Sequence, residues 1–242
     1  MEPIPAFVPE PQPEPLPPLR RLGIHASDYA WAVSNIWDGA RRPHPPERFR
    51  RGHLAPVILV PGVFESWTMM RLIAERLNRA GHPVHILPEL RRNTAPVETG
   101  AGLVERCLRD NDLNGTVIVA HSKGGLIAKQ VLLGEEQGRV ARVIAIATPF
   151  AGSSLARWMP TRVLRSLQPN DPGIRALVAR TEADARIVSI HPPFDPHIPD
   201  GSRLDGAENV PTAESGHFRI LGSPEVLDAI ERLADPGPAN GS

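Results

Sequence analysis

The stretch from Thr116 to Gly125, TVIVAHSKGG, decides the fold of this chain. Its first five residues form an apolar run that predicts a buried β-strand, and the residues after Ser122 begin a helical pattern. A serine between small residues at such a junction is typical of a sharp strand-to-helix turn, because larger side chains at positions 120 and 124 would clash there. The turn would lift the hydroxyl above the sheet, so Ser122 is a candidate nucleophile. The alternative is an ordinary N-cap serine.

Short apolar runs and amphipathic segments alternate from Pro56 onward, which is the pattern of a parallel α/β fold. The runs are rich in β-branched residues and lack period-two alternation, which indicates strands covered by helices on both faces. We therefore predict a mostly parallel sheet of about six strands flanked by helices, with no large cap. The expected strands are 57–60, 84–87, 116–120, 140–147, 186–190 and 210–213, and the expected helices are 67–80, 101–110, 124–133 and 223–235.

The segments outside this alternation suggest one domain with appendages. Residues 1–20 contain so many prolines that we expect a disordered tail, with a docking peptide for a proline-recognising domain as the alternative. Residues 21–53 read as a helix followed by a basic linker, and residues 237–242 as a second tail. The domain itself is expected over residues 54–236. The apolar residues of the helix are expected to lie on the main body: Tyr29, Trp31, Val33, Ile36 and Trp37.

Composition limits the classes of binding partner and the cellular compartment that we expect. The 27 basic and 27 acidic residues cancel, so no global charge favours nucleic acid or an anionic membrane. Cys107 is the only cysteine, which excludes an intramolecular disulfide and fits a reducing compartment. No apolar run approaches the length of a spanning helix, and the N-terminus lacks the features of a signal peptide. We therefore expect a cytoplasmic protein without stable membrane insertion.

A serine hydroxyl becomes a nucleophile only when a base takes its proton, and that base is most often an imidazole oriented by an acid. Among nine histidines, His217 stands out because its loop follows the last predicted strand, at the sheet edge where Ser122 should emerge. An ordinary loop histidine is the alternative. Asp195 lies on another loop at this edge and is the preferred acid. The remaining acid candidates are Asp200, Asp205 and Glu208.

Acyl-transfer chemistry also needs donors for the oxyanion of the tetrahedral intermediate, usually two backbone N–H groups. The amide of Lys123, directly after the nucleophile, is one candidate. The second should come from the loop after the first strand, LVPGVFES, where Gly62 permits a tight turn and Val63 presents its amide. Pro61 has no N–H to donate.

Four segments, VPGV, AHSKGG, TPFAGS and the run from SIHPPFDPHIP to SGHF, resemble the small α/β-hydrolase lipases and esterases of bacteria. The resemblance covers residues 55–234 and implies carboxylester hydrolysis through an acyl-enzyme, with Ser122, Asp195 and His217 carried over by motif and no cofactor. The chain departs from the family pattern at three places: Ala120 replaces the first elbow glycine, Lys123 an apolar residue, and VPG the usual HG. Because Lys123 should act through its backbone, we expect activity to survive and the acyl-chain preference to change.

The substrate is expected to be a small-molecule or lipid ester. Residues 154–184 carry helical fragments. In one hypothesis they form the wall of an apolar acyl pocket, and the expected pocket residues are Phe64, Phe150 and Trp158. In the alternative they pack on the sheet. Thirty residues are too few for a large lid, which favours short to medium acyl groups.

Two further histidine patterns are expected to be structural. His121 should lie beneath the turn and point away from Ser122. The spacing of His191, Asp195 and His197 would suit a metal, but Asp195 is already assigned to His217, so no metal is expected.

Two other functions stay open from the sequence. An acyltransferase or thioesterase would use the same three side chains. A catalytically silent binding module would keep the fold and engage a partner through the proline-rich tail.

Overall fold

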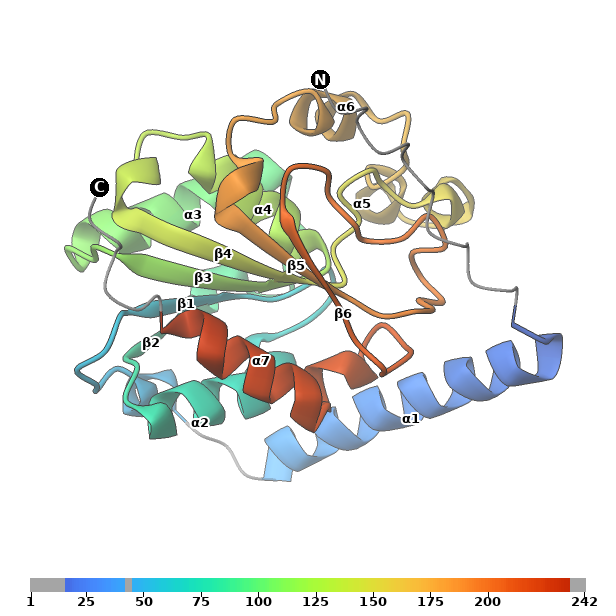
Figure 1. The fold of residues 1–242 in the computed structure, drawn as a ribbon, viewed down its shortest axis with the longest axis horizontal. Coiled ribbons are helices and arrows are strands. Elements are labelled where there is room, and N and C mark those ends of the chain that lie inside the picture. Colours follow the sequence, from blue (N-terminus) through green and yellow to red (C-terminus); the bar gives the residue numbers. More distant parts are fainter. Residues whose placement is uncertain (1–15, 42–44, 236–242) are drawn as a thin grey trace, which may run out of the picture.

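A computed structural model describes residues 16–41 and 45–235, so most of the predicted proline-rich tail and all of residues 237–242 lie outside the described residues. Six parallel strands form one sheet in the order β2-β1-β3-β4-β5-β6 (Figure 1). The predicted mostly parallel sheet is therefore confirmed. The strands are β1 (Val57–Val60), β2 (Val84–Ile86), β3 (Thr116–His121), β4 (Val140–Ile146), β5 (Ile187–His191) and β6 (Glu208–Pro211).

Helices cover both faces of the sheet (Figure 1). One layer contains α3 (Val97–Asp110), α4 (Lys123–Leu132) and α6 (Pro172–Val178), with the short α5 (Arg162–Arg165) near α6. The opposite layer contains α2 (Arg71–Ala80) and α7 (Pro224–Ala234), and α1 (Pro18–Arg41) runs along its outer side. The predicted helix over 67–80 is a 3-10 turn (Trp67–Met70) followed by α2.

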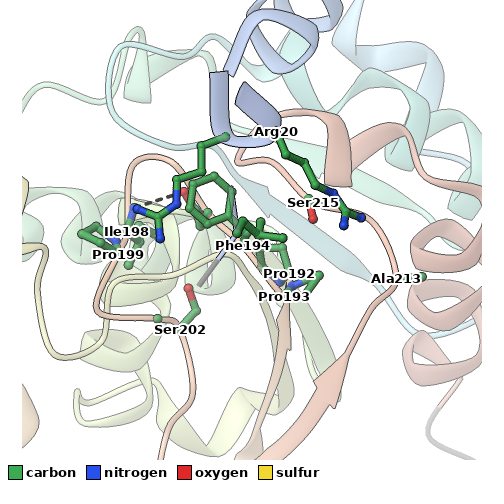
Figure 2. Close-up of a pocket in the computed structure, with 13 residues that line it drawn as sticks. Arg20, Pro192, Pro193, Phe194, Ile198, Pro199, Ser202, Ala213 and Ser215 are labelled. Atoms are coloured by element: carbon green, nitrogen blue, oxygen red, sulfur yellow. Dashed lines mark hydrogen bonds between the residues drawn. The ribbon is translucent and has the colours of Figure 1, made fainter. Parts of the chain in front are cut away.

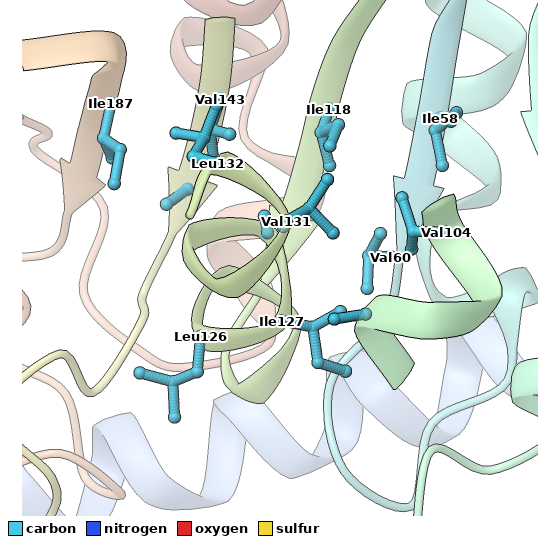
Figure 3. Close-up of a cluster of buried hydrophobic side chains, with 14 of the residues drawn as sticks. Ile58, Val60, Val104, Ile118, Leu126, Ile127, Val131, Leu132, Val143 and Ile187 are labelled. Atoms are coloured by element: carbon cyan, nitrogen blue, oxygen red, sulfur yellow. The ribbon is translucent and has the colours of Figure 1, made fainter. Parts of the chain in front are cut away.

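The two faces of the central strands enter two separate apolar cores. Ile58 and Val60 of β1 pack in one core with side chains of α3 and α4 (Figure 3), whereas Val57 and Leu59 belong to the core under α2 and α7. All four side chains are fully buried. Burial on both faces explains why these strands are apolar throughout and show no alternation.

The strand register brings several loops to one edge of the sheet. Val60 pairs with Ala120, and Ala120 pairs with Ala145, so β1, β3 and β4 end at the same level. Ile190 of β5 pairs with Ile146, which places the end of β5 beside them. The loops after these strands therefore meet at the carboxyl edge, where open α/β sheets bind their ligands.

Helix α1 lies against the main body as expected, and Trp31 packs on the core under α2 and α7, but the other four expected apolar residues are exposed. Tyr29, Val33, Ile36 and Trp37 are at least half exposed, at 50%, 65%, 53% and 60%. The buried stripe instead consists of small and polar residues: Asp28, Ala32, Asn35 and Gly39. Small residues permit close approach, and Asn35 donates through Nδ2 to the carbonyl oxygen of Met69 at 3.1 Å. The helix also begins at Pro18, inside the predicted tail.

Among residues 16–41 and 45–235, no helix is both long enough and apolar enough to cross a membrane.

Candidate active site

Ser122 occupies a strained turn between β3 and α4. Its backbone has a φ of 52° and a ψ of −124°, outside the regions that serine normally adopts. Its amide donates to the carbonyl oxygen of Ile146 at 2.9 Å, which fixes the turn to the end of β4. A Cβ atom at Gly124 would lie 2.2 Å from the carbonyl oxygen of Val60, so only glycine fits there. This is the geometry that the sequence predicted for the elbow.

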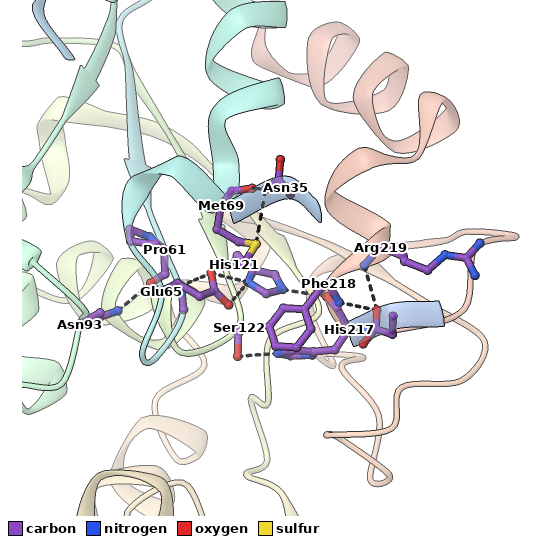
Figure 4. A network of polar contacts seen from close by, with 12 residues as sticks. Asn35, Pro61, Glu65, Met69, Asn93, His121, Ser122, His217, Phe218 and Arg219 are labelled. Atoms are coloured by element: carbon purple, nitrogen blue, oxygen red, sulfur yellow. Dashed lines mark hydrogen bonds and ion pairs between the residues drawn. The ribbon is translucent and has the colours of Figure 1, made fainter. Parts of the chain in front are cut away.

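The three residues chosen from the sequence lie within hydrogen-bond distance of one another. His217 Nε2 lies 3.0 Å from Ser122 Oγ (Figure 4), and His217 Nδ1 lies 2.7 Å from Asp195 Oδ2. All three side chains are buried. The alternative acids lie elsewhere: Asp200 accepts the amide of Ser154, and Asp205 and Glu208 are exposed.

The loop of Asp195 is organised around its carboxylate. Oδ1 accepts the backbone amides of His197 at 2.7 Å and Ile198 at 3.1 Å, which leaves Oδ2 for His217. Burial alone would raise the pKa of Asp195, but the hydrogen bond and charge of His217 and the His197 amide outweigh it, so the pKa lies below its ordinary value. The acid is therefore ionised at neutral pH.

The pKa of His217 is shifted in the other direction. Burial by itself lowers that pKa, but the charge and hydrogen bond of Asp195, with smaller contributions from Glu65 and Asp28, outweigh it and raise the pKa above its ordinary value. Burial and the neighbouring His217 lower the pKa of His197 to about 4, so His197 is a neutral wall beside the site. The imidazole whose pKa is raised, that of His217, thus faces Ser122.

A buried pair of His121 and Glu65 lies beneath the turn (Figure 4). His121 Nδ1 is 3.0 Å from Glu65 Oε2, and His121 Nε2 is 2.9 Å from the carbonyl oxygen of His217. Glu65 Oε2 also accepts the amide of Gly62 at 2.9 Å. The pair therefore connects the loop after β1, the elbow and the loop that carries His217 (residues 212–218, the histidine loop). The predicted structural position of His121 agrees with these contacts, but the sequence did not point to Glu65.

A metal does not fit the residues that come nearest to forming a site. In the described ranges, ligand atoms of Glu65, His121 and His217 lie within 4.8 Å of one another. Both ring nitrogens of His121 face oxygen atoms of Glu65 and His217, and His217 uses its nitrogens toward Asp195 and Ser122. The nitrogen atoms that a metal would need are therefore already engaged in hydrogen bonds within the protein.

The amide of Val63 lies on the loop after β1, and the amide of Lys123 directly follows Ser122 at the start of α4. Lys123 is the first residue of α4, where an amide has no partner inside the helix. Within residues 16–41 and 45–235, neither amide donates to a protein acceptor. Val63 lines the same cavity as Ser122. In this part of the chain, neither N–H group is thus engaged by a protein acceptor, and Val63 belongs to the cavity wall.

The side chain of Lys123 is buried and has a structural role that the sequence did not predict. It is 1% exposed, and its Nζ donates to the carbonyl oxygens of Asn93, at 2.9 Å, and Ala95. Burial lowers the pKa of Lys123 to about 8. The ammonium therefore ties the loop around Asn93 to the first turn of α4, and Asn93 in turn donates to the carbonyl oxygen of Pro61 at 2.6 Å.

A cavity of about 270 Å³ opens over Ser122 and His217. The segment 154–184 supplies apolar wall residues, as one of the two sequence hypotheses proposed: Leu155, Met159, Leu164 and Leu167. Phe64 also lines the cavity as expected. Two expected wall residues do not: Phe150 is 3% exposed and packs in the core under α4, and Trp158 is 75% exposed. Tyr29 of α1 takes part instead.

A second cavity, of about 490 Å³, is lined by the loop that carries Asp195 (residues 192–207, the acid loop) and by the start of α1 (Figure 2). Arg20 and Arg21 from the start of α1 border it, and the guanidinium of Arg21 lies 5.8 Å from the ring centre of Phe194. Asp195 contributes to this wall as well, and Ile198 of the same loop lines both cavities. Ser122 and His217 border the first cavity and not the second.

No protein-family model and no curated protein sequence matches the chain. Solved structures do match it. The mature form of the lipase BlEst2 from Bacillus licheniformis superposes with a TM-score of 0.59 at 16% identity, covering 80% of this chain and 94% of that one. Lipase B from Aspergillus fumigatus gives a TM-score of 0.62 at 19% identity, covering 79% of this chain and 55% of that one, so this chain spans about half of that lipase.

An extracellular α/β-hydrolase from a Paenibacillus species gives a TM-score of 0.52 at 14% identity, covering 75% of this chain and 98% of that one. Identities this low carry information about the fold alone. The parallel six-stranded sheet and the helices on both of its faces agree with these neighbours. The chain has the α/β-hydrolase fold.

Proposed function

We propose that this chain is a serine hydrolase that cleaves carboxylic esters through an acyl-enzyme intermediate. The observation that carries the proposal is the hydrogen-bonded series from Ser122 Oγ to His217 Nε2, at 3.0 Å, and from His217 Nδ1 to Asp195 Oδ2, at 2.7 Å. The likeness to solved lipases supports ester substrates, because two of the matching structures are named as lipases.

In the first half of the reaction, Ser122 Oγ attacks the ester carbonyl carbon while its proton passes to His217 Nε2. The carbonyl oxygen becomes an oxyanion, which the amides of Val63 and Lys123 would stabilise. The C–O bond to the alcohol then breaks, and His217 gives its proton to the departing alkoxide. The alcohol leaves, and the acyl group stays on Ser122.

In the second half, water enters in place of the alcohol. His217 Nε2 takes a proton from water as its oxygen attacks the acyl carbon, and the second tetrahedral intermediate collapses by breaking the bond to Ser122 Oγ. The serine recovers the proton from His217, and the carboxylic acid leaves. Asp195 keeps the imidazole in one orientation and stabilises its charged form throughout.

The dimensions of the cavity favour short to medium acyl groups. A volume of about 270 Å³ lies below the range of roughly 300–1,000 Å³ that is usual for drug-sized ligands. Its wall is mostly apolar, with Leu155, Met159 and Leu164 facing the site. An acyl chain would lie against these side chains, while a long chain would extend beyond them.

A panel of p-nitrophenyl esters of increasing acyl length tests this function. We expect turnover to be greatest for short and medium acyl groups and to disappear in Ser122→Ala. The absence of wild-type turnover across the panel would refute the proposal. Adding competing alcohols and measuring the products separates hydrolysis from acyl transfer, and thioester substrates test the thioesterase alternative.

We also propose a reducing, cytoplasmic location. Cys107 is the only cysteine, and burial raises the pKa of its thiol to about 11, so it stays protonated and unreactive at neutral pH. Fractionation of cells that make the full chain would test this location.

A further inference from the structure

A buried carboxylate from α1 holds the backbone of the histidine loop. Asp28 has no exposed surface. Its Oδ2 accepts the amide of His217 at 3.1 Å, and its Oδ1 accepts the amides of Phe218 at 2.8 Å and Arg219 at 2.9 Å. Asp28 lies 189 residues before His217 in the chain, so a distant segment determines where this loop sits.

The histidine loop is shaped to receive this carboxylate. Gly216 has a φ of +121°, and a Cβ atom there would lie 2.5 Å from Asp28 Oδ1. Glycine therefore permits both the backbone conformation and the close approach. The amide of Gly216 donates to the carbonyl oxygen of Phe194 at 2.9 Å, which joins the histidine loop to the acid loop. Arg219 adds a bond from Nη1 to Ser27 Oγ at 2.8 Å.

The peptide groups of His217 are fixed from two sides. Asp28 accepts its N–H, and His121 Nε2 lies 2.9 Å from its carbonyl oxygen. Asp195 then fixes the ring. The loop between β6 and the 3-10 turn Arg219–Gly222 has no helix or strand of its own around His217, so these side-chain contacts replace the missing regular structure. Displacing a catalytic group by about 1 Å can lower the rate by about 100-fold.

We propose that Asp28 is a positioning residue of the active site: by accepting the amides of the histidine loop, it keeps His217 Nε2 within hydrogen-bond distance of Ser122 Oγ. The inference rests on the proposed function of that pair. It makes α1 a component of the catalytic unit, although the helix precedes the first strand and lies outside the core layers.

The substitution Asp28→Asn tests the proposal with little change of shape. Its amide oxygen can still accept from Phe218 and Arg219, but its NH₂ group then faces the amide of His217, where two donors oppose each other. We expect kcat for a p-nitrophenyl ester to fall by about 10- to 100-fold with KM within about twofold, because the cavity wall is unchanged.

A second readout separates positioning from simple stabilisation. The charged and titratable groups around His217 are Asp195, Glu65, Asp28, His121 and His197. The charge of Asp28 contributes to the raised pKa of His217, so Asp28→Asn should move the acidic limb of the kcat/KM profile to lower pH. Hydrogen exchange should also become faster at the amides of residues 217–219. A purely stabilising residue would lower the melting temperature and leave the acidic limb in place.

The control is Val33→Ala on the same helix, where the side chain is 65% exposed. It should leave kcat and the acidic limb unchanged. If Asp28→Asn is not folded at the assay temperature, Asp28→Ser, which leaves room for a bridging water, is measured instead with the same expectations.

An inactive wild type would refute the proposed function. An active wild type together with unchanged kcat, pH profile and amide exchange in the Asp28 variant would overturn the inference about Asp28 alone.

Discussion

The serine elbow and the histidine loop face each other across 3.0 Å at one edge of the sheet, yet they are held in different ways. The elbow is built from consecutive residues of β3 and α4, with a strained serine and a glycine that no other residue can replace. The histidine loop is held by side chains from distant segments: Asp28, His121 and Asp195. Local sequence thus encodes the proposed nucleophile, whereas tertiary contacts position its proposed base.

The largest effect is expected where the histidine loop meets the acid loop. Asp195→Asn keeps the shape but no longer stabilises the charged imidazole or its orientation, so kcat should fall by about 10⁴-fold. Ester turnover under saturating substrate measures this. Unchanged turnover would show that another carboxylate orients His217, and Asp200→Asn is the matched control because its side chain contacts Ser154 instead.

A substitution in the elbow should lower turnover less than Asp195→Asn does, but it should lower the folding stability more. In Gly124→Ala the new methyl group meets the carbonyl oxygen of Val60 at 2.2 Å, and backbone atoms of β1 and α4 must separate. We expect kcat to fall by about 100-fold and the free energy of unfolding to fall by about 1–3 kcal/mol. Gly102→Ala is the control, since a Cβ there meets nothing within 4 Å. Equal behaviour of the two variants would contradict the steric account.

Glu65 connects the two regions, so its replacement tests whether they depend on each other. Glu65→Gln removes the charge that both His121 and the amide of Gly62 contact. We expect a loss of about 1–3 kcal/mol in unfolding free energy, together with a decrease in kcat of about tenfold. Denaturant titration and ester kinetics measure the two quantities. A loss of stability with full turnover would show that the two regions are independent.

The pH dependence of kcat/KM should report the environment of the histidine loop. His217 must be neutral to accept the serine proton, and its pKa is raised above the ordinary 6.5. Activity should therefore rise with pH, with a midpoint above 6.5, and the midpoint should move to lower pH in Asp195→Asn. A wild-type midpoint below 6.5 would mean that burial outweighs the carboxylates.

On the elbow side, we expect a change in folding stability with pH. The pKa of Lys123 is about 8 in the folded chain and 10.5 ordinarily, so between these values the unfolded chain binds more protons. Its contribution to stability therefore becomes more favourable as pH rises from 8 to 10.5. Denaturant unfolding at several pH values should show this rise in the wild type relative to Lys123→Met. Parallel curves for both proteins would refute the assignment.

The same contrast explains what the sequence could predict. The strands and the elbow depend on neighbouring residues, so apolar runs and the pattern around Ser122 were sufficient. Because parallel strands end at one edge, the sequence predicts that Asp195 and His217 lie together. The choice of Asp195 over Asp200 followed from loop order, and the structure agrees with that geometry.

The orientation of α1 and the residues of the cavity wall depend on tertiary contacts, which a local sequence pattern does not predict. The apolar residues of α1 suggested a buried face, but the polar stripe of Asp28 and Asn35 is buried, because it satisfies backbone groups of other segments. The sequence signal for this buried face is the helical spacing of Asp28 with the small residues Ala32 and Gly39. Phe150 and Trp158 were misplaced because the direction of a loop side chain depends on how the segment packs.

The most direct test of the central claim is mass spectrometry of the full chain after reaction with a fluorophosphonate. We expect one adduct per chain, located by peptide mapping on Ser122, absent from Ser122→Ala and formed far more slowly by His217→Ala. An unlabelled wild type, an adduct on another residue, or equal labelling of Ser122→Ala would contradict it.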